Sequence, residues 1–197
     1  MPTVRSVTVY AGSSTSASAQ HVEVARRLGR GLARRGWVVV YGGARIGLMG
    51  ALADAALEAG GRVEGVILDT FARVAHASLH DLVTVTDMRS RKAGLAHRGD
   101  AYVVLPGGFG TLEELSEILV ERQLSLHRKP LVLVNVEGFW DPLLELIERQ
   151  IASGLVKERY RALLTVVRGP HEAVDAVARY ASERDADLVA DVDKILE

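Results

Sequence analysis

The segment Leu105–Leu115 places glycines, a threonine and two carboxylates at the junction of an expected strand and an expected helix. It reads Leu-Pro-Gly-Gly-Phe-Gly-Thr-Leu-Glu-Glu-Leu. Backbone amides around Gly108–Thr111 would form a cradle for an anion, with the Thr111 hydroxyl as a further donor. In the functional interpretation, one carboxylate faces a sugar, where it binds ribose hydroxyls or stabilises positive charge at the anomeric carbon. Acids in a first helical turn also suit the helix macrodipole, so a plain helix-start preference is the alternative.

Upstream, the segment Asp87–Lys92 puts three cations, Arg89, Arg91 and Lys92, at the start of another expected helix. The positive end of the helix dipole disfavours cations, so this placement costs free energy unless an anion binds there. An arginine can contact a phosphate with two parallel hydrogen bonds, and a lysine acts as a point charge. The pattern therefore favours an anion site over a solvated surface.

Two other loops are rich in small residues. Ala11-Gly12-Ser13-Ser14-Thr15-Ser16 follows the first expected strand, and its hydroxyls suit either a helix cap or an anion. The second loop, Tyr41–Gly50, contains Gly42, Gly43 and Gly47, and Gly47 opens a helix whose free amides favour phosphate. A purely structural turn is a serious alternative there. Neither loop carries the Gly-x-Gly-x-x-Gly dinucleotide fingerprint, which disfavours an NAD-dependent oxidoreductase.

Short apolar runs alternate with longer amphipathic stretches, and this alternation predicts the elements that would position these loops. The expected strands are Val4–Tyr10, Trp37–Tyr41, Val63–Ile67, Leu82–Val85, Ala101–Leu105, Leu131–Val136 and Leu163–Val167. The expected helices are Ala19–Arg35, Gly47–Ala59, Arg89–His97, Thr111–Leu126, Pro142–Ser153 and a last one from about Glu172. Strands that are apolar throughout are typical of a parallel sheet covered on both faces. The sequence therefore predicts an α/β fold: a doubly wound, mostly parallel sheet flanked by helices, Rossmann-like and three-layered.

Composition narrows the class of protein. The chain has 197 residues with a formal net charge of −1, is 48% hydrophobic and contains 19 glycines and no cysteine. These values predict one globular domain over residues 1–197, with an acidic helical tail at about 183–197. Balanced charge argues against a nucleic-acid partner, and the lack of a long apolar run or leader argues against a membrane and for a cytoplasmic location. His76 and His80 stand i,i+4 without a further ligand, so we expect no metal.

Taken together, three motifs resemble the LOG ("lonely guy") family of cytokinin riboside 5′-monophosphate phosphoribohydrolases, often labelled lysine decarboxylase-like. They are Gly42-Gly43 with Gly47-x-Met49-Gly50, Met88-x-x-Arg91-Lys92, and Pro106-Gly107-Gly108-x-Gly110-Thr111-x-x-Glu114. Further similarity lies in Gln123-Leu124-x-x-His127-x-Lys129-Pro130 and Gly138-Phe139-Trp140. The resemblance extends from Val7 to about Val167.

The resemblance implies hydrolysis of the N-glycosidic bond of an N6-modified adenosine 5′-monophosphate, which releases free base and ribose 5-phosphate. It makes Arg91 and Glu114 the catalytic pair and implies no cofactor and a homodimer, with the site near the subunit interface. The expected substrate-binding residues are Gly12, Ser13, Gly42, Gly43, Gly47, Met49, Met88, Lys92, Pro106, Gly107, Gly108, Phe109, Gly110, Thr111 and Glu113. Arg91 could hold the phosphate, orient the ribose or stabilise the departing purine.

Two departures from the family pattern concern substrate preference. Arg89 follows the motif methionine where the family commonly has histidine, and Arg73 stands two positions before Ala75-His76 where an acid is usual. The alternatives are therefore a nucleosidase acting on AMP or another common monophosphate, and a nucleotide-binding module without catalysis. A pyridoxal-phosphate decarboxylase is disfavoured, because of the four lysines only Lys92 lies in an expected site loop.

Overall fold

The computed structural model describes residues 4–182, and over this range the strands form one sheet in the order β4-β3-β2-β1-β5-β6-β7. Every neighbouring pair is parallel. The strands are β1 (Ser6–Tyr10), β2 (Val38–Tyr41), β3 (Val63–Leu68), β4 (Asp81–Val85), β5 (Ala101–Val104), β6 (Leu131–Val134) and β7 (Thr165–Val167). The predicted doubly wound parallel sheet is confirmed.

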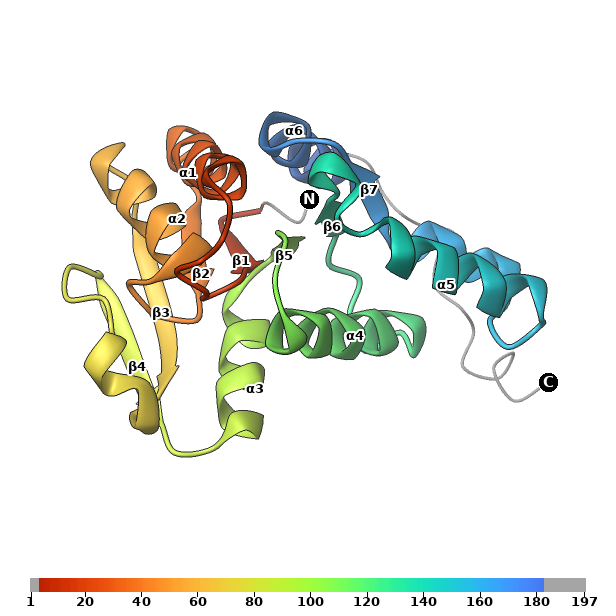
Figure 1. Cartoon of the computed structure of the whole chain (residues 1–197), viewed down its shortest axis with the longest axis horizontal. Helices are drawn as coiled ribbons and strands as arrows, with labels where there is room; N and C mark the ends of the chain where they lie inside the picture. Colours follow the sequence, from red (N-terminus) through yellow and green to blue (C-terminus); the bar gives the residue numbers. More distant parts are fainter. Residues whose placement is uncertain (1–3, 183–197) are drawn as a thin grey trace.

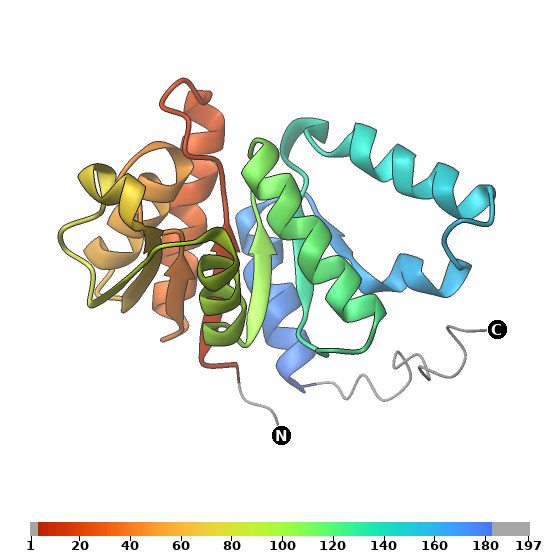
Figure 2. The ribbon, with the colours of Figure 1, turned by 90° about the horizontal axis from the view of Figure 1, so that it is seen from below.

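Helices cover both faces of the sheet, as Figures 1 and 2 show. The α-helices are α1 (Ala19–Arg34), α2 (Gly47–Glu58), α3 (Met88–Arg98), α4 (Phe109–Gln123), α5 (Asp141–Ala152) and α6 (Pro170–Ser182). Short 3-10 helices are η1 (Asp69–Val74), η2 (Val136–Gly138) and η3 (Glu158–Leu163). One core joins α1, α2 and α6 to the sheet, and a second joins α3 and α4 to the opposite face. The three-layer architecture follows from strands that are apolar on both faces.

The strand order reverses beside β1. The chain runs outward from β1 through β2 and β3 to β4, and then returns to place β5 on the other side of β1. The loops that leave β1 and β5 therefore diverge at the carboxyl ends of adjacent strands. In open α/β sheets, ligands bind in the crevice at this switch point.

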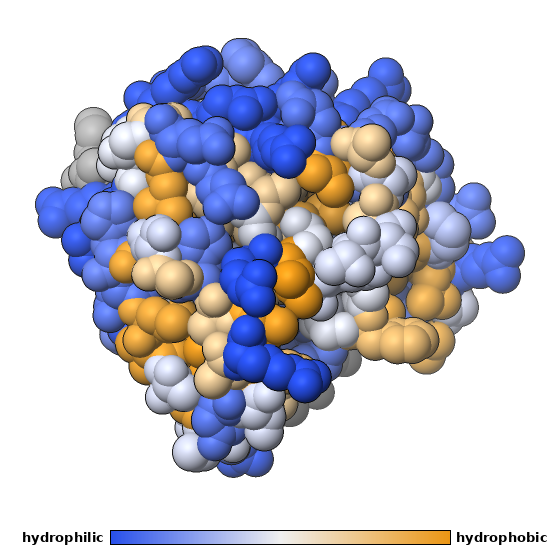
Figure 3. Space-filling model, turned by 60° about the vertical axis from the view of Figure 1, so that its left-hand side comes forward, coloured by the Kyte–Doolittle hydropathy of each residue, from blue (hydrophilic) through white to orange (hydrophobic). Residues whose placement is uncertain are grey.

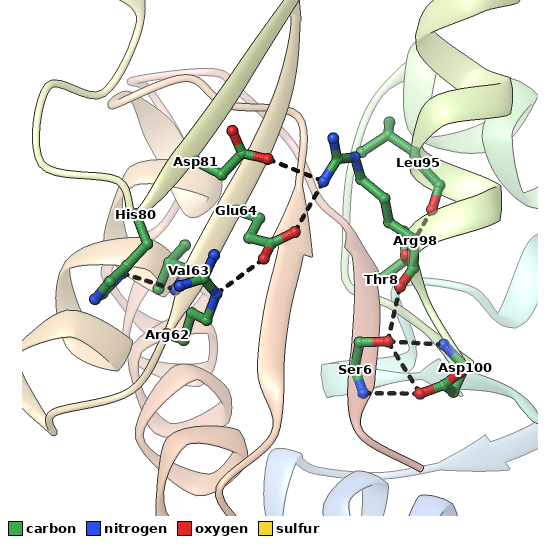
Figure 4. A network of polar contacts seen from close by, with 10 residues as sticks. All are labelled: Ser6, Thr8, Arg62, Val63, Glu64, His80, Asp81, Leu95, Arg98 and Asp100. Carbon is green, nitrogen blue, oxygen red and sulfur yellow. Dashed lines mark hydrogen bonds and ion pairs between the residues drawn. The ribbon is translucent and has the colours of Figure 1, made fainter. Parts of the chain in front are cut away.

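A network of ion pairs and hydrogen bonds fastens the end of α3 to the opposite, amino-terminal side of the sheet (Figure 4). Arg98, in the last turn of α3, donates hydrogen bonds to Glu64 of β3 (2.9 Å) and Asp81 of β4 (3.0 Å). Just beyond the helix, the carboxylate of Asp100 accepts from the backbone amides of Arg5 and Ser6. One end of α3 is thus fixed to three strands, and its other end points toward the switch point.

Some predicted element bounds were wrong for local reasons. Val136 lies in η2 rather than in a strand, because the side-chain oxygen of Asn135 accepts a hydrogen bond from Trp140 N and turns the chain. Helix α4 starts at Phe109, two residues before the predicted start, and ends at Gln123. Ser125, with a φ of 59°, leads the chain away from the helix before the predicted end at Leu126.

Two predictions concern the ends of the chain and the membrane. The predicted acidic tail at 183–197 lies outside the described residues. None of the helices within 4–182 combines the length and the apolar character that crossing a bilayer requires.

Candidate active site

Arg91 and Glu114 form an ion pair between α3 and α4 at the switch point. Arg91 Nη1 donates a hydrogen bond of 2.9 Å to Glu114 Oε1, and the two side chains are only 14% and 9% exposed. Asp87 caps α3 by accepting from Ser90 N (2.9 Å) and Ser90 Oγ (2.6 Å), which fixes the helical turn that presents Arg91. Sequence reasoning named both members of this pair, and the fold brings them together across 23 residues of chain.

Burial and the guanidinium act on Glu114 in opposite directions. Burial raises the pKa of Glu114 above its ordinary value of 4.5, and the charge and hydrogen bond of Arg91 lower it without cancelling the effect of burial. Next to this carboxylate, burial and then the charge of Glu114 raise the pKa of Tyr10 well above its usual range. The pair therefore lies in a weakly screened environment, where its charges act strongly on a bound molecule.

A cavity of about 560 Å³ opens beside the pair, and the loops leaving β1, β2 and β5 form its walls. Gly12 N donates to Pro106 O (3.1 Å), which joins the first and third of these loops. The lining residues are Ala11, Gly12, Ser13, Ser14, Ala17, His21, Gly42, Ala44, Ile46, Leu48, Met49, Ile67, Phe71, Val74, Met88, Arg91, Pro106, Gly107, Gly108, Phe109, Gly110, Thr111, Glu114 and Phe139. This volume falls in the range of small-molecule sites.

The polar part of the cavity lining suits an anion. The first amides of α4 have no acceptor within the helix, and the helix dipole adds partial positive charge there. Gly107 lies so close to Thr111 that a Cβ at position 107 would overlap the threonine hydroxyl. Gly12 also packs closely against this loop, since its Cβ would stand 3.3 Å from Gly107 Cα. Bare backbone and one hydroxyl thus face the space next to Arg91 and Glu114.

Another part of the cavity lining is apolar. His21 of α1 and Phe139, which precedes α5, meet edge to face with ring centroids 5.6 Å apart. Phe71 of η1 and Met88 of α3 line the same cavity and remain partly exposed. On the face seen in Figure 3, hydrophobic side chains likewise reach the surface in patches between hydrophilic ones. An apolar group of a ligand would cover these lining side chains.

Four residues that the sequence assigned to substrate binding do not line the cavity: Gly43, Gly47, Lys92 and Glu113. The amides of Leu48 and Met49, near the start of α2, both donate to Gly12 O, so the protein itself uses the helix end that was expected to favour phosphate. Gly47, with a φ of 60°, packs against the backbone of Ser13.

Lys92 pairs with the chain's own carboxylates. Its ammonium contacts Glu113 and, at 3.1 Å, Glu117, so that it forms a second ion-pair bridge between α3 and α4. The hydrogen bonds that Lys92 donates to these two carboxylates raise its pKa. The cations at the start of α3 were expected to attract an anionic ligand. For Lys92, the negative charge comes instead from Glu113 and Glu117 of α4.

Sequence reasoning missed the apolar wall of the cavity. His21, Phe71 and Val74 lie on elements with no motif of their own, and their place depends on how α1 and η1 pack at the carboxyl ends of the strands. Phe139 belongs to a segment of family resemblance but had no assigned role. Ser14 could have been predicted from the sequence, because it directly follows the predicted Gly12-Ser13 pair.

The two histidines that raised the question of a metal have structural partners. His76 is buried, its Nε2 lies 2.9 Å from Asp54 Oδ1, and its Nδ1 accepts from Ser78 N. His80 Nδ1 accepts from Val63 N. Within residues 4–182 no three histidine or acidic side chains gather as a metal-binding group.

A family model and several known proteins match this chain over much of its length. Residues 49–177 match a family model described as possible lysine decarboxylase. A protein of Rhodococcoides fascians named cytokinin riboside 5′-monophosphate phosphoribohydrolase is 42% identical over 89% of this chain and 90% of its own length. The Oryza sativa protein of the same name, LOG, is 38% identical over 95% of this chain and 78% of its own length.

Solved structures share the architecture. The molybdenum cofactor carrier protein of Chlamydomonas reinhardtii superposes with a TM-score of 0.67 at 20% identity, covering 90% of this chain and 98% of its own. The structure titled TM1055 superposes with a TM-score of 0.68 at 24% identity, covering 89% and 99%. At these identities the likeness concerns the fold alone.

Proposed function

The chain belongs to the LOG family of cytokinin riboside 5′-monophosphate phosphoribohydrolases, and on that premise we propose that Arg91 and Glu114 catalyse the family reaction in this cavity. The reaction is hydrolysis of the N-glycosidic bond of an N6-modified adenosine 5′-monophosphate to free base and ribose 5-phosphate. The observation that carries the proposal is the buried 2.9 Å pair at the wall of a nucleotide-sized cavity.

Glu114 acts at the sugar. Cleavage of a glycosidic bond passes through an oxocarbenium-like state, which a carboxylate stabilises by its charge or by activating water. Both roles require the ionised form, which burial disfavours and which Arg91 favours, offsetting part of the effect of burial. Arg91 therefore favours the ionised form of Glu114 and orients its carboxylate. Its guanidinium also adds a positive charge near the departing purine.

The polar and the apolar parts of the lining bind different parts of the nucleotide. The amides that open α4, together with the Thr111 hydroxyl and the loop around Ser13, bind the 5′-phosphate. Binding energy gained at the phosphate then supports cleavage at the sugar. The apolar wall around Phe139 takes the purine and its N6 substituent, which favours a modified base over plain AMP.

Decarboxylation does not fit the residues present. A pyridoxal-phosphate enzyme binds its cofactor through a Schiff base to a lysine. None of the described residues that line the cavity is a lysine, and the ammonium groups of Lys92 and Lys129 are engaged by Glu113 and by Ala96 O. We derive no step through that cofactor.

We also propose that the protein is a cytoplasmic homodimer that buries the outer face of α4. Val120 on this helix, and Leu124 and Leu126 just beyond it, are exposed in the single chain, and Phe109 at the start of the helix is 91% exposed. Exposed apolar side chains grouped on one element favour a protein interface. A partner on this face would also close the cavity rim near Phe109.

The test is a panel of nucleotides with chromatographic detection of free base. We expect isopentenyladenosine monophosphate to be cleaved faster than AMP, and Glu114→Gln to abolish release of ribose 5-phosphate while nucleotide binding remains measurable. Glu117→Gln, on the same helix but outside the cavity, is the matched control and should retain turnover. Near-normal turnover by Glu114→Gln, or binding of nucleotides by the wild type without cleavage, would overturn the proposal.

A further inference from the structure

Gly42 lies at the end of β2, on the cavity wall facing Arg91. Glycine is often required where the backbone has a positive φ, but Gly42 is not among the positive-φ residues of the described chain, whereas its neighbour Gly43 is, at 78°. Alanine could therefore adopt the backbone conformation of Gly42. The reason for glycine at this position must be space.

The space beside Gly42 is filled by the guanidinium of Arg91. A Cβ built on Gly42 would stand well inside 3.0 Å of both Arg91 Nη2 and Met49 Cε. Among the glycines of the described chain, Gly42 is the one whose nearest Cβ neighbours include Arg91. The guanidinium thus rests with Nη2 against the bare Cα, while Nη1 donates to Glu114.

We propose that Gly42 is a positioning residue, whose missing side chain seats the Arg91 guanidinium against Glu114. The inference rests on the proposed function of that pair and adds a residue that acts through it. Contact with Gly42 on one side and the hydrogen bond to Glu114 on the other hold the planar group in one orientation. A methyl group at position 42 removes that seat and drives the guanidinium toward the open cavity.

The expected effect of Gly42→Ala is large for so small a change. A displacement of about 1 Å in a catalytic group can lower turnover by about 100-fold, and we expect a loss of that order in kcat. In addition, the positive charge and the hydrogen bond that lower the pKa of Glu114 act on it less strongly once the guanidinium has moved away. The acidic limb of the pH–rate profile should therefore move to higher pH, which a general loosening of the loop would not cause.

Gly169→Ala is the matched control. Gly169 lies before α6, has no positive φ and has nothing within 4 Å of the position its Cβ would take. We expect this variant to keep the turnover and pH profile of the wild type. A comparable loss in Gly169→Ala would mean that any added methyl group disturbs the protein, and would overturn the inference.

Two further measurements do not depend on turnover. A crystal structure of Gly42→Ala should show Arg91 Nη1 separated from Glu114 Oε1 beyond hydrogen-bonding distance. In denaturant unfolding, Gly42→Ala should lower the midpoint in the wild type, and the loss should be smaller in the Arg91→Ala background, where Met49 Cε alone still stands within 3.0 Å of the Cβ. An intact 2.9 Å pair in the variant, or equal losses in the two backgrounds, would refute the role of Gly42. Wild-type protein without hydrolase activity would refute the proposed function and leave these two measurements valid.

Discussion

Replacing Arg91 by alanine should destabilise the folded protein by an amount that depends on pH. The variant leaves the carboxylate of Glu114, which is 9% exposed, without its 2.9 Å partner. A charge left unpaired in the interior is costly, because neither water nor a counter-charge compensates it. Glu114 can escape part of this cost by taking up a proton.

The size of the effect follows from burial. Breaking a buried ion pair by removing one partner costs about 3–5 kcal/mol, whereas losing an exposed pair costs about 0–1 kcal/mol. With side chains 14% and 9% exposed, the pair stands near the buried limit, so we expect about 3 kcal/mol at pH 8. At pH 5 a larger fraction of Glu114 is protonated, and the loss should approach the value for a neutral hydrogen bond, about 1 kcal/mol.

The sign follows from linkage between protonation and folding. The folded-state pKa of Glu114 is already above its ordinary value of 4.5, because burial outweighs Arg91, and removing Arg91 raises it further. A raised folded-state pKa favours folding at low pH, and this contribution is lost as pH rises through that pKa. Because the pKa shift of Glu114 is larger in the variant, the variant loses more stability than the wild type as pH rises. The difference in unfolding free energy should therefore grow with pH in the range above 4.5.

The assay is denaturant unfolding of both proteins at pH 5 and pH 8. The same Arg91→Ala change in a Glu114→Gln background is the control, and there the loss should be smaller and independent of pH. A loss in the wild-type background that is equal at both pH values would refute the reasoning. So would a pH dependence that persists with glutamine at position 114.

Two further predictions concern the apolar surfaces. Phe139→Ala should raise KM for isopentenyladenosine monophosphate by about tenfold and for AMP much less, because it removes apolar contact area from the cavity wall. Steady-state kinetics with both substrates checks this, and equal effects on the two KM values would mean that the base binds elsewhere. Val120→Asp should convert a dimer to a monomer in sedimentation velocity without loss of helix content, since the Val120 side chain is exposed in the single chain. A wild-type protein that sediments as a monomer would contradict the proposed dimer.

The sheet and its flanking helices could be predicted because the signal is local. Runs such as Val38–Tyr41 and Leu131–Val134 are apolar at every position, which indicates burial on both faces wherever they lie in the sheet. The ends of elements were less accessible. Helix α4 begins within Gly-Phe-Gly, a sequence that favours a loop, and no side chain caps it. The tertiary position of the loop, rather than helix propensity, sets that start.

The partners of the charged residues were harder to predict than the residues themselves. Arg91 and Glu114 stand in motifs that pointed to an anion site, and they meet at the cavity. Lys92 was expected to bind the ligand for the same reason, but its side chain leaves the helix in another direction and meets Glu113 and Glu117. Adjacent positions on a helix differ by about 100° in direction, so Arg91 and Lys92 of one motif face different surfaces.

The contrast between these two ion pairs indicates which of them is kept for chemistry. Lys92 pairs with two partly exposed carboxylates, and its hydrogen bonds to them outweigh the desolvation of its ammonium, so that its pKa is raised. Arg91 and Glu114 are buried together, and the pKa of Glu114 stays raised, so even beside its partner the ionised carboxylate is less favourable in the fold than in water. A neutral glutamine at position 114 could accept the same hydrogen bond, but it would leave the buried guanidinium of Arg91 without a counter-charge. Replacing both residues by well-packed apolar side chains would avoid both costs, so stability alone gives no reason for a buried ion pair here, whereas stabilising an oxocarbenium-like sugar requires the negative charge of Glu114.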